Sequence, residues 1–159
     1  MAILSSREGL QFSTTLESDC APLNELVAAM LAVSNQIRFL RDPTRGGLAS
    51  TLNELARQSE VGIWVEEDRV PIREEVRGAC ELLGLDPWAM ANEGKLVAVV
   101  AADDAERILR EMQAHPLGRQ AAMIGEVREE PTGKVILQTL IGSTRILDMM
   151  VGEALPRIC

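Results

Sequence analysis

The sequence contains no tyrosine, and two phenylalanines and two tryptophans bring the aromatic share to only 3% of its 159 residues. Hydrophobic residues nevertheless make up 47% of the chain. The core must therefore be aliphatic, and a composition this apolar argues against an intrinsically disordered chain. A chain of this length typically folds as one domain, so we expect a single hydrophobic core.

Side chains that bind transition metals are scarce. His115 is the only histidine, and Cys20, Cys80 and Cys159 are widely spaced without a C-x-x-C pair. Zinc sites and disulfide frameworks need more ligands at closer spacing, so we predict neither, and no metal site. Cys80 shares a helical face with Ala79 and is expected to be buried. Cys20 precedes a helix start, which could lower its pKa, but packing is the simpler interpretation.

Clusters of positive charge and long apolar runs are also missing. The net charge of −8 repels nucleic-acid backbones and anionic lipid, and no run of lysine and arginine offsets it. The first residues, MAILSSREGLQF, lack the basic and apolar stretches of a signal peptide, and no segment is long and apolar enough to span a membrane. We expect a cytoplasmic protein that binds neither nucleic acid nor membrane.

Hydrophobic periodicity predicts alternating helices and strands. Pro22 is expected at the first turn of a helix with one buried face, formed by Leu23, Leu26, Val27, Met30 and Leu31. Further helices are predicted over 48–56, over 71–84 with Gly84 at the end, and from Asp103 or Asp104 as a cap to Met112. Strands are predicted over 36–40, 61–66, 121–127 and 133–140, with 96–102 as a central strand apolar on both faces.

These elements indicate an α/β (α+β) fold, a single domain with one mixed β-sheet covered by helices. We place the domain at residues 1–152 and a flexible C-terminal tail at 153–159. Residues 1–8 are predicted to end a helix that Gly9 stops, and they begin without a cap, as if another segment preceded them.

A first candidate for chemistry is RDPTRGG, residues 41–47, between a strand and a helix. Gly46 and Gly47 allow a close backbone approach, and the following helix start favours an anion such as phosphate. Arg45 could bind that anion, and Asp42 could cap the turn or help to hold Mg²⁺. The spacing does not match a Walker A loop, and a tight turn with a capped helix explains the same residues.

A second candidate is ANEGKL, residues 91–96, directly before the most hydrophobic strand. Glu93 could be a partly buried carboxylate with a raised pKa that serves as an acid or base, with Lys95 nearby as a charge partner. An ordinary turn into a strand accounts equally well for the asparagine, the glutamate and the glycine.

The third candidate is the end of the chain, EALPRIC. Seven residues from Glu153 to Cys159 could extend roughly 20 Å and carry a terminal thiol into another protein's pocket. A thiolate is a strong nucleophile, and Arg157 would favour its formation. A frayed terminus with an unused cysteine is the alternative.

Together these stretches resemble the C-terminal half of the HypE family of hydrogenase maturation factors, relatives of the aminoimidazole ribonucleotide (AIR) synthetase and selenophosphate synthetase superfamily. The resemblance covers nearly the whole chain and is carried by RDPTRGGLASTLNELA, VPIREEVRGACELLGLDP, ANEGKL, HPLG with AAMIGEV, and the terminal PRIC. PRIC distinguishes this family from its relatives. The resemblance implies the fold of the C-terminal domain of AIR synthetase-related proteins.

The resemblance also implies an activity. In this family HypF transfers a carbamoyl group to the terminal cysteine, here Cys159, and ATP-dependent dehydration converts it to a thiocyanate. The cyanide passes through HypC and HypD to the iron of nickel–iron hydrogenase. Glu93 is then the candidate base, with Asn92 and Lys95 in support. The nucleotide side would be lined by Asp42, Thr44, Arg45, Gly46 and Gly47.

The family has a preceding domain that carries most ligands of ATP and Mg²⁺ and the main contacts of a homodimer, and this sequence lacks it. We therefore expect the 159-residue chain alone to bind no cofactor firmly, to be inactive, and to expose apolar surface. Two alternatives remain open: a non-catalytic interaction module whose thiol is unused, and an ATP-dependent small-molecule synthetase such as selenophosphate synthetase.

Overall fold

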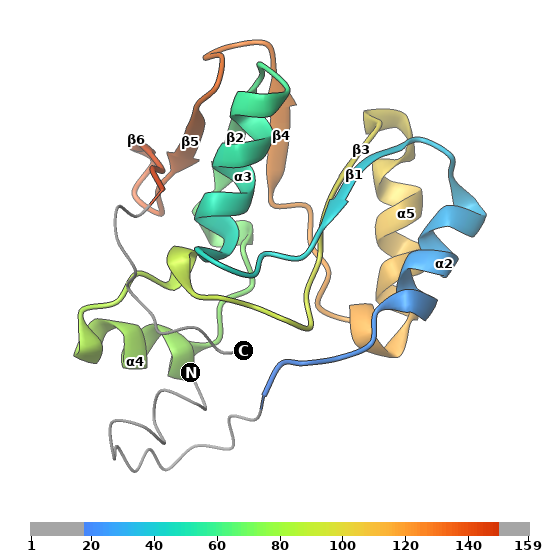
Figure 1. Cartoon of the computed structure of the whole chain (residues 1–159), viewed down its shortest axis with the longest axis horizontal. Coiled ribbons are helices and arrows are strands. Elements are labelled where there is room, and N and C mark those ends of the chain that lie inside the picture. Colours follow the sequence, from blue (N-terminus) through green and yellow to red (C-terminus); the bar gives the residue numbers. More distant parts are fainter. Residues whose placement is uncertain (1–17, 150–159) are drawn as a thin grey trace.

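The computed structural model describes residues 18–149 (Figure 1). The predicted helix over 1–8 and the tail with Cys159 lie outside these residues. The helices are α2 (Asn24–Val33), α3 (Gly47–Gln58), α4 (Glu74–Leu83) and α5 (Ala102–Ala114), with short 3-10 turns η1 (Glu67–Arg69), η2 (Pro87–Ala89) and η3 (Pro116–Gly118). The strands are β1 (Ile37–Arg41), β2 (Gly62–Glu66), β3 (Val97–Val100), β4 (Gly125–Arg128), β5 (Val135–Gln138) and β6 (Thr144–Ile146).

The predicted fold class, a mixed α/β domain, is confirmed, but the strands divide between two sheets. In one, β1 pairs with β3 as an antiparallel ribbon. In the other, the order is β4-β2-β5-β6, with β2 and β5 parallel and the other neighbours antiparallel. Within residues 18–149 the prediction that 96–102 forms a central strand is not met, because β3 has only β1 beside it there. Each sheet instead has its own covering helices.

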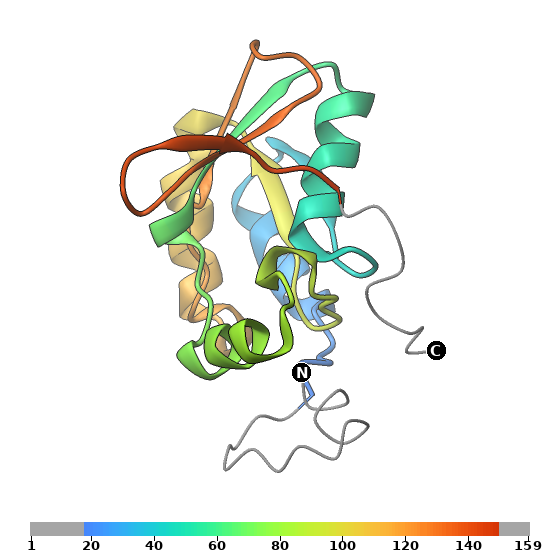
Figure 2. The same ribbon diagram turned by 90° about the vertical axis from the view of Figure 1, so that its left-hand side faces the viewer.

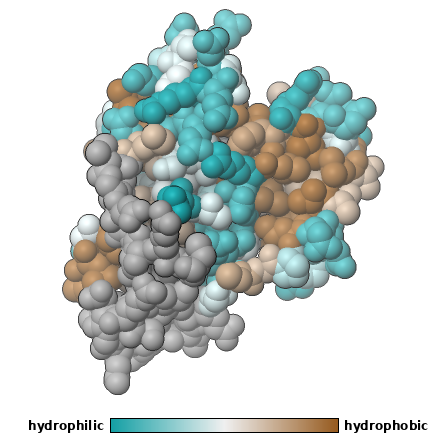
Figure 3. Space-filling view, viewed as in Figure 1, coloured by the Kyte–Doolittle hydropathy of each residue, from teal (hydrophilic) through white to brown (hydrophobic). Residues whose placement is uncertain are grey.

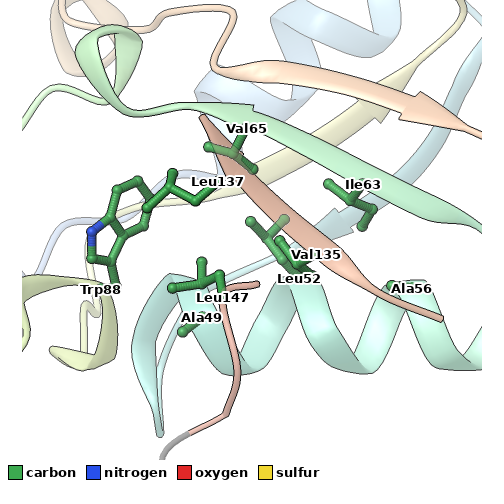
Figure 4. Close-up of a cluster of buried hydrophobic side chains, with 9 residues drawn as sticks. All are labelled: Ala49, Leu52, Ala56, Ile63, Val65, Trp88, Val135, Leu137 and Leu147. Atoms are coloured by element: carbon green, nitrogen blue, oxygen red, sulfur yellow. The ribbon is translucent and has the colours of Figure 1, made fainter. Parts of the chain in front are cut away.

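The larger core lies between α3 and the four-stranded sheet (Figure 4). Ile63 and Val65 occupy alternate positions of β2, so both side chains point toward α3, as expected for a strand with one buried face. The other members of this core are Ala49, Leu52, Ala56, Trp88, Val135, Leu137 and Leu147. Trp88 in η2 packs at the end of the core nearest the start of α3, so the loops at that end lie against packed side chains.

The smaller core lies between the β1–β3 ribbon and helices α2 and α5, around Leu26, Met30 and Ile108. The predicted helix over α2 is present and begins at Asn24, two residues after Pro22. Leu31 was expected on its buried face but is 55% exposed. The segment NELVAAMLAV is apolar nearly all round, and neighbouring elements cover only part of it. Figure 3 shows an apolar area over α2 and the ribbon.

Most other element boundaries lie within three residues of the predictions, but the strand predicted over 121–127 is observed only over Gly125–Arg128. Gly84 ends α4 in the left-handed conformation with φ of 65°, as predicted. Asp103 and Asp104 do not cap α5; Ala101 occupies the cap position, and both aspartates lie in the first turn, where their charge favours the helix dipole. Strand β6 was not predicted.

The two described cysteines differ. Cys80 is 1% exposed, and burial raises the pKa of its thiol, which agrees with a structural role. Cys20 was expected to pack and is exposed instead. Within residues 18–149, no helix has the length and apolar character needed to cross a membrane.

Candidate active site

The first site segment forms the turn into α3. Gly46 and Gly47 have φ of 74° and 60°, a region that favours glycine, and the Gly47 N–H donates to the Thr44 carbonyl over 3.0 Å. No side chain caps α3, so apart from the Gly47 N–H, which the Thr44 carbonyl accepts, the N–H groups of its first turn have no side-chain partner. The Asp42 and Arg45 side chains beside this helix start are exposed.

Gly47 itself is buried under the protein's own chain. A Cβ at this position would lie 2.5 Å from the Met90 carbonyl oxygen and 2.6 Å from that of Trp88. The close backbone approach predicted for the glycine pair is therefore made at Gly47 by η2 and by Met90, the residue that follows it. Gly47 shapes the turn rather than facing open space.

The second site segment lies against the first. The Asn92 backbone N–H donates to the Pro43 carbonyl over 3.0 Å, and its side-chain amide donates to the Met90 carbonyl over 2.8 Å. Residues 42–47 and 92–93 therefore meet at the N-terminal end of α3, at the lower end of this helix in Figure 1. The Glu93 side chain next to this junction is exposed, so the expectation of a partly buried carboxylate is wrong.

A third segment, around Asp19 just before α2, binds the second one. One carboxylate oxygen of Asp19, Oδ2, accepts hydrogen bonds from the Lys95 ammonium over 2.9 Å and from the Glu93 backbone N–H over 3.4 Å. Any side chain on Gly94 would overlap the Asp19 carbonyl oxygen. Partial burial would raise the pKa of Asp19, but the hydrogen bond and charge of Lys95 and the backbone N–H groups outweigh it, so the pKa is lowered.

Sequence reasoning missed Asp19. Its contacts join residues 74 and 76 positions apart, and no local pattern marks an aspartate before a helix as the partner of a distant glycine and lysine. The only local signal was the glycine in NEGKL, which indicates that some backbone comes close there.

A hollow of about 410 Å³ lies elsewhere, between the end of α4, η2 and β6. Its lining includes Arg77, Arg145 and Glu67 but none of the predicted site residues. No group of three or more histidine, cysteine, aspartate or glutamate side chains within residues 18–149 is arranged to hold a metal ion. The segments joined by the Asn92–Pro43 hydrogen bond thus carry an uncapped helix start, the exposed Arg45 and the exposed carboxylates of Asp42 and Glu93, groups that suit phosphate binding and proton transfer. Cys159 lies outside the described residues.

Comparison with known proteins agrees with the resemblance seen in the motifs. The chain is 55% identical over all 159 residues to carbamoyl dehydratase HypE of Cupriavidus necator, of which it covers 45%. The chain therefore spans about half the length of the curated relatives it matches.

Solved structures give the same result. A crystal structure of hydrogenase maturation protein HypE in complex with ATP superposes with a TM-score of 0.90 at 43% identity, over 96% of this chain and 47% of that one. The crystal structure of a HypE–HypF complex gives 0.88 at 44% identity, over 93% and 48%. A family model for the AIR synthase related protein, C-terminal domain, matches residues 1–138. The chain belongs to this family, the C-terminal domains of AIR synthase related proteins.

Proposed function

We propose that this chain is the C-terminal part of a HypE-type carbamoyl dehydratase that acts in hydrogenase maturation. Identity of 55% extends over the full chain, and the similar structures include one with ATP and one with HypF. The observation that carries the proposal is the junction of residues 42–47 with Asn92 and Glu93 at the start of α3. There a helix start suited to bind a phosphate lies beside the exposed Glu93 carboxylate.

The reaction assigns a separate task to each group. HypF would load a carbamoyl group onto the Cys159 sulfur. The amide oxygen of the S-carbamoyl group then receives the γ-phosphoryl group of ATP while one proton leaves the nitrogen. Loss of the second nitrogen proton expels phosphate and leaves the thiocyanate, with ADP as the other product. Glu93 accepts a nitrogen proton. It and Asp42 are the only carboxylates among the predicted site side chains, and Asp42 is assigned to Mg²⁺.

The nucleotide side belongs to the first segment. The uncapped N-terminus of α3 and the Arg45 guanidinium attract phosphate oxygens, and Asp42 is suited to hold Mg²⁺ at the phosphates. The Thr44 carbonyl and the two glycines shape this turn, and Asn92 ties it to Glu93.

The test follows the sulfur of Cys159 in the longer protein that contains this chain. Incubation with HypF, carbamoyl phosphate and ATP is expected to yield a carbamoyl adduct on Cys159 that then loses water, as mass spectrometry detects. Replacing Cys159 with serine should abolish both steps. An unmodified tail would support an interaction module instead, and an activity that survives the loss of Cys159 would support a small-molecule synthetase.

Because the relatives are about twice as long, we assign the activity to the longer protein. The 159-residue chain alone is expected to bind ATP weakly and hydrolyse none, and calorimetry that shows micromolar ATP binding would contradict this. The longer protein is proposed to be a cytoplasmic homodimer that passes cyanide to HypC and HypD. Its remaining half would cover the apolar area over α2 and the ribbon, where Leu31 is exposed (Figure 3).

A further inference from the structure

We propose that Asp19 is a positioning residue of the dehydration site: its carboxylate fixes the backbone of Glu93, and so the direction of the Glu93 side chain toward the nucleotide side. This inference rests on the proposed role of Glu93 as the base.

The first support is that one oxygen atom of Asp19 binds two residues of the segment that carries the proposed base, Glu93 itself and Lys95. Oδ2 accepts from the Glu93 backbone N–H and from the Lys95 ammonium, so the backbone before Gly94 and the side chain after it bind the same oxygen atom. Glycine has the widest conformational freedom of all residues, and without such a tie this stretch could adopt many orientations. The carboxylate removes that freedom next to the group that accepts the proton.

The second support is that the same stretch is held from its other side. Asn92 donates its N–H to Pro43, so the segment is fixed to the turn before α3 at residue 92, and to Asp19 through the Glu93 backbone and the Lys95 side chain. Glu93 lies between the two attachments. A base must lie within hydrogen-bonding reach of the proton it accepts, and both attachments restrict where its carboxylate can be.

The third support concerns stability. The side chains of Asp19 and Lys95 are 36% and 53% exposed, and ion pairs this exposed contribute little to folding. Neither residue belongs to the two hydrophobic cores. The ion pair therefore adds little to folding stability, but it lies next to Glu93, whose orientation matters for its proposed role as the base.

The experiment measures single-turnover dehydration in the longer protein, already carbamoylated on Cys159. Asp19→Ala removes the carboxylate but keeps the backbone carbonyl that packs on Gly94. We expect the rate constant at saturating ATP to fall about 10- to 100-fold, because a displacement of about 1 Å can cost this much. The ATP concentration for half-maximal rate should stay within about twofold, since Asp19 does not line the phosphate side.

Asp19→Asn provides the rescue. Its amide oxygen can still accept from the Glu93 N–H but no longer pairs with a charge on Lys95, so its rate should lie between those of wild type and Asp19→Ala. Glu106→Ala is the matched control, because Glu106 is likewise a carboxylate in a surface ion pair, on α5. It should react at the wild-type rate.

The two hypotheses fail in different ways. If Glu93→Gln reacts at the wild-type rate, Glu93 is not the base, and the proposal for Asp19 is overturned with it. If Glu93→Gln is inactive but Asp19→Ala and Asp19→Asn both react within about twofold of wild type, only the role of Asp19 is refuted. If Asp19→Ala does not fold, the Asp19→Asn rate decides.

Discussion

Replacing Gly47 with alanine is expected to destabilise the protein and to separate the two halves of the candidate site. The residue has φ of 60°, where an L side chain costs about 1–2 kcal/mol. The added Cβ would also lie 2.5 Å from the Met90 carbonyl oxygen and 2.6 Å from that of Trp88. Because these are backbone atoms, they can yield only if the segment after η2 moves.

The two effects together should lower the free energy of unfolding by about 2–5 kcal/mol, since overpacking adds typically 1–3 kcal/mol. For a domain of this size the melting temperature would fall by roughly 4–20 °C. Movement of the segment after η2 would also weaken the hydrogen bond from Asn92 to Pro43. Urea unfolding followed by circular dichroism gives the stability, and amide exchange at Asn92 reports the junction.

Gly78→Ala is the matched control. Gly78 lies inside α4, and an added Cβ would have no atom within 4 Å. This change should raise stability by about 0.5–1 kcal/mol, because alanine is the better helix former. The reasoning from close packing would be refuted if Gly47→Ala unfolded within about 0.5 kcal/mol of wild type.

Three further outcomes are expected. Leu52→Ala should cost about 2–5 kcal/mol in urea unfolding, because Leu52 is buried in the larger core; a cost below about 1 kcal/mol would contradict that packing. The pKa of Asp104 is lowered mainly by the hydrogen bond that the Ser34 hydroxyl donates, and further by the hydrogen bond and the charge of Arg107. Its contribution to stability is therefore present above the pKa of the unfolded aspartate, near 4, and is lost as the pH falls through the lowered value, so Asp104→Asn should flatten that part of the acid-unfolding curve. An unchanged curve would argue against the pair. Finally, iodoacetamide should alkylate Cys20 in the native protein and Cys80 only after unfolding, as peptide mass spectrometry can show; equal native rates would contradict the burial of Cys80.

The sequence was sufficient for features set by near neighbours in the chain. The stripe of leucines and alanines in α3, the alternation of Ile63 and Val65 and the glycine that ends α4 all depend on the geometry of a single helix or strand. The loop residues of the candidate site were found as glycine, asparagine and charged side chains between regular elements, but such residues also form ordinary turns, and the resemblance to a known family was needed to single them out.

Contacts between distant segments needed the tertiary structure. Val97–Val100 was predicted as a central strand because its residues are apolar, yet hydrophobicity does not specify how many strands lie beside it. Leu31 has the spacing of a buried residue, but its exposure depends on which elements cover α2. In each case the hydrophobic pattern indicates the element but does not specify which other elements pack beside it.

The sequence by itself determined the type and order of most helices and strands, the aliphatic core and the residues available for chemistry, since composition and periodicity fix these locally. The tertiary structure alone decided that the strands form two sheets, that Asn92 joins the turn before α3, and that Asp19 holds Glu93 and Lys95. The physical reason is that such contacts depend on which distant surfaces pack together, and that choice is made by the free energy of the whole folded chain rather than by any short stretch of it.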